Sequence, residues 1–308
     1  MIGLLLKRTG QAVLSLFATI LFVFFLVRLT GDPAYFLLAP DAPAEDFVRI
    51  RQELGLDRSL LVQFFTYVGH VAQGDLGYSY RLDVPVTEMV LRRLPATLAM
   101  GMSAIILTIV IAVPLGIYAA YRRNGIVDRL ARYIAALGQA TPSFWVGLVL
   151  ILVFAINFGW LPSGGYGTFP HVILPAFALA FEPIARLTRL LRSGMIEELG
   201  SEHVKFLRIK GLQEWLVLWK HALRNAGLTT LTFVGMMTAN ILTGSVLVET
   251  VFVWPGVGRL LVESIYYRDF SVVQGIVLLI AAAYIVINLI VDLLHMLLNP
   301  RLRLSGVH

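Results

Sequence analysis

The stretch LPATLAMGMSAIILTIVIAVPLGIYAAY, from Leu94 to Tyr121, contains no charged side chain and decides the fold class. A helix needs about 20 predominantly apolar residues to cross about 30 Å of hydrocarbon. This run is longer than that and is typical of a helix that spans a membrane. It therefore predicts an integral membrane protein.

Other charge-free runs of similar length lie on both sides of this one. The run from Tyr133 to Phe181 is too long for a single span, and the segment from Gly159 to Gly165 divides it into one helix ending near Phe158 and another starting near His171. The remaining spans are predicted between Arg8 and Arg28, over 225–248 and over 270–291. The prediction is an all-α, polytopic protein, with residues 1–308 forming one transmembrane domain of six transmembrane helices.

The composition agrees with a membrane protein and excludes several other classes. Hydrophobic residues make up 58% of the chain, charged residues 14%, and the mean hydropathy is +0.79. Because most basic residues lie beside apolar runs, their excess is interpreted as a topology signal and not as a nucleic-acid interface. The chain has no cysteine, which excludes disulfides and cysteine-ligated metal sites.

The basic residues also predict orientation. Sixteen Lys and Arg residues lie on one side of the predicted spans, and only Arg259 and Arg268 lie in the short loops on the other side. Cytoplasmic loops of membrane proteins carry this excess. Both termini are therefore predicted to be cytoplasmic, with residues 31–96 forming an external insertion after the first helix.

The external insertion contains two predicted helices. The first covers Ala44–Leu54 and ends at Gly55, and the second covers Ser59–Gln73 and ends at Gly74. The second helix has a broad apolar side. We expect that side to lie on the membrane helices or at the membrane interface.

Residues 193–227 form the longest predicted cytoplasmic loop. Ser201 is a predicted N-cap, Val204 and Leu207 share a helical face with Arg208, and Lys210-Gly211 ends the helix in a left-handed turn before a second helix starts at Gln213. Such a segment either fixes topology through its positive charge or docks as a rigid projection into a partner's groove. The spacing alone leaves both interpretations open.

Several blocks of residues occur in a specific order along the chain. They are Arg28-Leu29-Thr30-Gly31-Asp32-Pro33, Leu54-Gly55-Leu56-Asp57, Gly74-Asp75-Leu76-Gly77-Tyr78-Ser79, Ala185-Arg186-Leu187-Thr188-Arg189, His221-Ala222-Leu223-Arg224-Asn225-Ala226, the run from Glu249 to Leu260, and Pro300-Arg301-Leu302-Arg303. In this order the chain resembles the B-type permeases of the dipeptide, oligopeptide and nickel ABC importers, which are inner-membrane components of binding-protein-dependent transport systems. The resemblance implies a type I importer permease fold in a bacterial or archaeal plasma membrane.

The resemblance also implies partners and a role for the 193–227 loop. It implies a second homologous permease, two ATP-binding-cassette subunits that carry the ATP and Mg, and an external solute-binding protein, with no cofactor on this chain. The loop is then the element that couples to the ATPase, and bulky Phe206 and Leu207 stand where the family usually carries small residues. The coupling candidates are Glu202, His203, Val204, Lys205, Phe206, Leu207, Arg208, Lys210, Gly211 and His221.

Polar residues inside the predicted spans are candidates for a translocation path or gate, because charge in a membrane is costly. Glu182 and Arg186 lie one helical turn apart and are expected to pair, either as a buried structural pair, which is favoured, or as a solute contact. Glu249 is assigned to a gate or a receptor contact, and Pro142 to a bend. For the polar residues of the fifth span, hydrogen bonding between helices is an equal alternative. The full set is Pro142, Ser143, Glu182, Arg186, Asn240, Thr243, Ser245 and Glu249.

The sequence contains no nucleotide-binding loop of the form Gly-x-x-x-x-Gly-Lys-Ser/Thr, no nucleophile–base set and no histidine pair with metal-ligand spacing. The chain is therefore predicted to be a non-catalytic, metal-free subunit that imports short peptides or a related solute such as a nickel complex or a glutathione-like compound. The alternative is a self-powered secondary transporter with Glu182 as its coupling acid.

Overall fold

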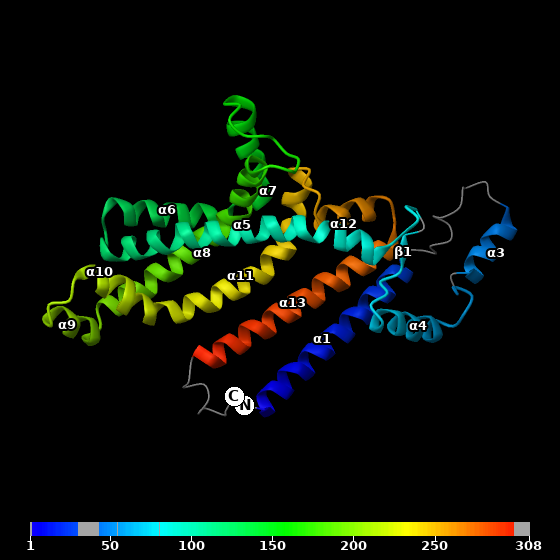
Figure 1. The fold of residues 1–308 in the computed structure, drawn as a ribbon, viewed down its shortest axis with the longest axis horizontal. Helices are drawn as coiled ribbons and strands as arrows, with labels where there is room; N and C mark the ends of the chain where they lie inside the picture. The colour runs from blue at the N-terminus through cyan, green and yellow to red at the C-terminus, as the bar shows by residue number, and fades with distance from the viewer. Residues whose placement is uncertain (1, 30–42, 54, 80, 299–308) are drawn as a thin grey trace. The chain divides into compact units, whose positions relative to one another are not determined.

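The computed structural model is almost wholly helical and describes residues 2–29, 43–53, 55–79 and 81–298 (Figure 1). Sequence blocks at 30–33 and 300–303 lie outside the described residues. The long helices are α1 (Ile2–Leu29), α5 (Val86–Tyr121), α8 (Phe169–Leu199), α11 (Leu223–Val251) and α13 (Phe270–Leu298). The shorter elements are α3 (Ala44–Glu53), α4 (Leu60–Ala72), α6 (Ile126–Ala140), α7 (Ser143–Leu150), α9 (Glu202–Ile209), α10 (Glu214–Leu216), α12 (Val257–Tyr266), and the π-helical segments η1 (Ile151–Asn157) and η2 (Val217–Ala222).

The predicted third span is broken in two. It starts at Ile126, earlier than predicted, and α6 ends at Ala140 while α7 starts at Ser143, with a change of direction of 110°. Pro142 lies between them in an extended conformation and has no N–H to continue the helical hydrogen bonds, so the chain turns there. The proline therefore produces a break, which is sharper than the predicted bend.

Among the described residues, four helices are long and apolar enough to cross a membrane, and the bent pair of α6 with α7–η1 raises this number to at most five. The predicted span over 225–248 lies within α11, and the division near Gly159 is confirmed because η1 ends at Asn157 and α8 starts at Phe169. The polytopic helical fold is thus confirmed. The count of six spans stays a prediction.

The chain divides into two compact units, the first formed by Met1–Pro95 with Gly256–Leu289 and the second by Ala96–Pro255 with Ile290–His308. In the first unit, α4 packs through Phe64 against Ile20 and Phe24 of α1 and Leu278 of α13. Part of the apolar side of the predicted second external helix therefore lies on membrane helices, as expected, whereas Leu61 and Phe65 on the same helix are exposed. Burial raises the pKa of the Tyr67 hydroxyl in this cluster to about 12, although nearby Arg28 acts in the opposite direction.

The first unit also contains a hairpin that the all-α prediction did not include. Strands β1 (Tyr78–Ser79) and β2 (Val84–Pro85) pair antiparallel, and Asp83 takes a left-handed conformation in the turn. The buried Ser79 hydroxyl donates a hydrogen bond to Asp269, which lies directly before α13. The strands are too short to give a period-two pattern in the sequence.

The second unit is built around α8, which packs against α6, α7 and α11. Its main apolar cluster includes the fully buried Leu187, Val248 and Trp254. Small residues allow close approach: a Cβ atom added at Gly138 of α6 would lie 2.5 Å from the Cβ atom of Ala185 on α8. This unit contains the 193–227 segment and every candidate site residue.

Candidate functional site

The connection between α8 and α11 is a compact helical projection, formed by α9, the turn after it, α10 and η2; it lies at one end of α8 and α11 (Figure 1). Val204 of α9 is fully buried and packs in a cluster with Met195 of α8 and Val217 of η2, with Leu207 partly buried against it. Ile117 of α5 belongs to the same cluster. The projection is therefore fixed to the ends of three long helices.

The ends of α9 have the predicted caps. The Ser201 hydroxyl accepts a hydrogen bond from the Val204 N–H at 3.3 Å, and the chain leaves the helix through Lys210 and Gly211. Gly211 has φ of +77°, which is the left-handed region that disfavours residues with a Cβ atom. The N-cap, the glycine turn and the second helix, which starts after Gln213, are thus confirmed.

A bidentate ion pair closes the turn between the two arms of the projection. The Arg208 Nη2 and Nε atoms donate to Glu214 Oε1 and Oε2 at 2.6 and 3.2 Å. This hydrogen bonding raises the pKa of the Arg208 guanidinium, so the arginine stays charged. Arg208 lies one turn from Val204, on the face predicted for it, and its exposed side chain holds α9 against the start of α10 through this pair.

A second polar contact joins the projection to both long helices. Glu198, near the end of α8, accepts a hydrogen bond from Asn225 of α11 at 2.8 Å and lies 3.3 Å from His203 of α9. The rings of His203 and His221 are 6.3 Å apart. Glu198 was not predicted as a site residue, although its separation of five residues from His203 across Gly200 was a usable signal.

The outer surface of the projection carries exposed apolar side chains. Phe206 is 52% exposed and Ile209 is 82% exposed; they lie three residues apart on the face of α9 opposite Val204. Lys210 lies over the Phe206 ring at 4.5 Å, and Trp215 of α10 is also exposed. The two bulky residues noted in the sequence therefore differ, because Leu207 points into the projection and Phe206 points out of it.

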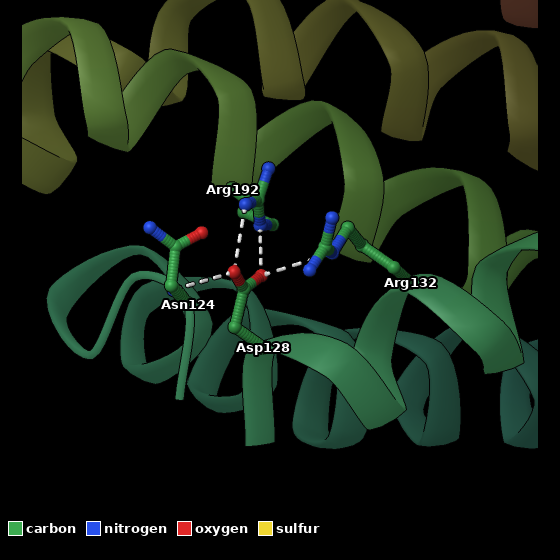
Figure 2. A network of polar contacts seen from close by, with 4 residues as sticks. All are labelled: Asn124, Asp128, Arg132 and Arg192. Carbon is green, nitrogen blue, oxygen red and sulfur yellow. Dashed lines mark hydrogen bonds and ion pairs between the residues drawn. The ribbon is translucent and has the colours of Figure 1, made fainter. Parts of the chain in front are cut away.

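A buried carboxylate links α6 to α8 near the projection, as Figure 2 shows. Asp128 is fully buried and pairs through both oxygens with Arg192, whose Nη2 lies 2.9 Å from Oδ2. The Asn124 N–H donates to the same oxygen at 2.9 Å, and Arg132 lies 3.9 Å away. The sequence predicted only a topology role for these arginines and gave no role to Asp128, the acid between them.

One cavity brings together four of the predicted path residues. Ser143 of α7, Glu182 and Arg186 of α8, and Asn240 of α11 line a space of about 90 Å³, with apolar walls that include Phe233. All four lie in the second unit, but they come from three different helices. The packing of α8 against α7 and α11 therefore assembles this polar cavity.

Glu182 and Arg186 form the predicted ion pair, but the pair is not buried. The side chains of Glu182 and Arg186 are 37% and 53% exposed. Within this chain alone the acid and base thus face the cavity and not a packed helix interface, and the choice between a structural pair and a solute contact stays a prediction. Their exposure leaves them available to a solute or to another subunit.

The remaining path candidates lie elsewhere. Pro142 is exposed beside the α6–α7 break, Ser245 is buried in α11, and the side chain of Thr243 lies outside the described residues. Glu249 is fully buried and accepts a hydrogen bond from the Thr97 hydroxyl at 2.8 Å. The receptor contact considered for Glu249 does not fit a carboxylate that the second unit encloses, and the gate alternative stays a prediction.

No group of three or more His, Asp or Glu side chains in the described part of the chain is arranged to hold a metal ion. The polar groups instead form ion pairs within the protein and line one cavity. Together with the long apolar helices and the capped helical projection, this arrangement is typical of a polytopic membrane protein.

Comparison with known proteins identifies the family. Residues 112–304 match the binding-protein-dependent transport system inner membrane component, and residues 1–101 match the N-terminal part of such membrane components. The chain belongs to this family. It is a multi-pass inner-membrane permease component of an ABC importer.

Its similarity to curated relatives spans nearly the whole chain. It is 38% identical to the glutathione transport system permease protein GsiC of Salmonella paratyphi A and 37% identical to a putative peptide transport system permease protein of Brucella abortus, covering 98% of this chain and 99% of each relative. A solved chain of the MetNI methionine ABC transporter, in an inward-facing conformation, aligns with a TM-score of 0.56 at 17% identity over 68% of this chain and 96% of that one. The last likeness supports the permease fold alone.

Proposed function

We propose that this chain forms, with a second homologous permease subunit, the translocation path for short peptides or a glutathione-like solute. The solute class is supported by the curated relatives, which are named for glutathione and peptide transport. A solute-binding protein delivers the solute on the external side, and two ATPase subunits bind on the cytoplasmic side. The excess of basic residues around the α8–α11 connection supports this orientation.

The observation that carries the proposal is the outward apolar face of α9. Exposed Phe206 and Ile209 lie on a short helix whose opposite face is anchored by buried Val204. Apolar side chains gathered on a water-facing projection are a common mark of a protein contact. A projection fixed to α5, α8 and α11 moves together with the ends of these helices, so closure of an ATPase bound there is transmitted to the path.

A self-powered transporter is the weaker candidate. Such proteins usually hold a coupling ion at acids or broken helices near the middle of the membrane. Glu182, the acid considered for that role, is ion-paired with Arg186. We therefore assign the energy source to the partner ATPases.

Purification of the tagged chain from its native membrane in mild detergent tests the proposal. We expect a second permease and an ATPase to copurify, with ATP hydrolysis stimulated by the binding protein. In Ile209→Glu, a charge replaces an apolar contact, so recovery of the ATPase should fall at least about tenfold while the second permease is retained.

Arg123→Glu is the matched control, because Arg123 is exposed in the turn between α5 and α6 and lies outside the projection. The same amount of ATPase should copurify with the Arg123→Glu chain as with the unmodified chain. Full recovery of the ATPase by Ile209→Glu would contradict the docking role of α9. A chain that purifies alone and without ATPase activity would contradict the importer assembly.

A further inference from the structure

The Glu182–Arg186 pair is the charged feature of the cavity. Both residues lie within α8, which is long and apolar enough to cross a membrane. Both are partly exposed, and charged side chains facing lipid hydrocarbon are strongly unfavourable. This face of α8 therefore points to another subunit or to a water-filled path.

The cavity offers polar groups of several kinds within an apolar wall. Arg186 carries a planar fork of N–H donors, Glu182 a carboxylate, Asn240 an amide and Ser143 a hydroxyl. Pro183 also lines the cavity and lacks the N–H that would bond the carbonyl of Leu179, another lining residue. The set can bind amide groups and both signs of charge.

We propose that the Glu182–Arg186 pair is a transient binding site for the charged ends of a zwitterionic, amide-containing solute. The Arg186 guanidinium binds the carboxylate of the solute, and the Glu182 carboxylate binds its ammonium group. Asn240 and Ser143 bind the amides between them. This inference rests on the proposed import of peptide-like solutes and identifies the site within the path where they are held.

The pair suits brief binding because it is satisfied in both states. Without solute, the two side chains pair with each other. With solute, one intramolecular ion pair is exchanged for two ion pairs, so neither charge is left unpartnered when the solute enters or leaves. A guanidinium fork also matches a carboxylate in a bidentate geometry.

The test is ATP-dependent uptake by proteoliposomes that contain the complete complex and its binding protein, with trialanine and reduced glutathione as probes. The variant is Glu182→Gln with Arg186→Gln, which keeps side-chain size and hydrogen bonding but removes both charges. Uptake of the probe that the unmodified complex imports should fall at least about tenfold. ATP hydrolysis stimulated by the binding protein should stay within about twofold.

The matched control is Glu88→Gln with Arg92→Gln, since these residues form another exposed acid–base pair four residues apart but do not line the cavity. Its uptake should stay within about twofold of the unmodified complex. Unchanged uptake by the Glu182→Gln, Arg186→Gln variant would overturn the site, and so would loss of uptake together with ATP hydrolysis, because that result assigns the pair to folding or coupling. An unmodified complex that imports neither probe would overturn the proposed solute class as well.

Discussion

Two of the arginines of helix α8, Arg186 and Arg192, lie six residues apart in opposite situations. Arg192 pairs with the fully buried Asp128 of α6, so its contact joins two helices. Arg186 pairs with Glu182 of its own helix, and both side chains face a cavity. Only the first pair is placed to hold the fold together.

The two pairs differ in how much stability the protein would lose if one partner of the pair were removed. A buried carboxylate without its partner is left uncompensated in a medium of low dielectric constant, whereas exposed pairs contribute little to stability. Charges kept at an exposed position in a membrane helix need another reason, and binding of a charged solute provides one. The structural pair and the proposed binding pair on α8 therefore differ in burial.

The largest expected effect is loss of the buried pair. Asp128→Ala leaves Arg192 without its carboxylate, and breaking a buried pair costs about 3–5 kcal/mol. We expect reduced assembly and a clearly lower aggregation temperature of the detergent-solubilised complex. The Glu182→Gln, Arg186→Gln variant should aggregate near the temperature of the unmodified complex. An equal fall in aggregation temperature in the two variants would contradict the claim that only the buried pair stabilises the fold.

The next largest loss of stability is expected when the close packing of α6 on α8 is disrupted. Gly138→Val places new atoms against Ala185, where even a Cβ atom would lie at 2.5 Å. Overpacking of this kind costs about 1–3 kcal/mol. The aggregation temperature should fall, whereas Gly194→Ala should be tolerated, because a Cβ atom there lies 3.5 Å from its nearest neighbour, Ala226. A stable Gly138→Val protein would show that the α6–α8 contact is loose.

Replacement of Gly211 affects coupling more than stability. A Cβ atom at Gly211 would meet no atom within 4 Å, so Gly211→Val acts only through the left-handed backbone, at about 1–2 kcal/mol. We expect ATP hydrolysis to continue while ATP-dependent uptake falls severalfold, since the turn that orients α9 is changed. Gly211→Asn should retain uptake, because asparagine tolerates this conformation. Normal uptake by Gly211→Val would remove the coupling role assigned to the glycine.

The smallest effect is expected at Arg132. Its Nε atom lies 3.9 Å from Asp128, and its side chain is 54% exposed. Arg132→Gln should therefore change the free energy of unfolding by less than about 1 kcal/mol. If Arg132→Gln lowered the aggregation temperature as much as Asp128→Ala does, the stability of the buried carboxylate would depend on Arg132 as well as on Arg192.

Local patterns in the sequence predicted much of this fold. Apolar runs located the long helices, and Ser201 and Gly211 marked the ends of α9 correctly, because caps depend on neighbouring residues. The break at Pro142 was underestimated, since a proline within a long apolar run permits both a bend and a reversal. The β1–β2 hairpin was missed because two-residue strands leave no periodic signal.

The candidate site was predicted less completely, because its contacts join distant residues. The Glu182–Arg186 pair was found from its spacing, but its exposure depends on how α7 and α11 pack beside α8. Asp128 and Arg192 are 64 residues apart, so no local pattern connects them. In the same way, sequence spacing could not show that Phe206 faces outward and Leu207 inward without the cluster around Val204.

The most direct test of the central claim is the energy source of uptake. Proteoliposomes containing the chain with its partner permease, ATPases and binding protein would be assayed for trialanine and glutathione uptake with ATP, with a non-hydrolysable ATP analogue, and with a protonophore. We expect uptake that requires ATP hydrolysis and persists when the proton gradient is dissipated. Uptake that continues with the analogue and stops with the protonophore would contradict it.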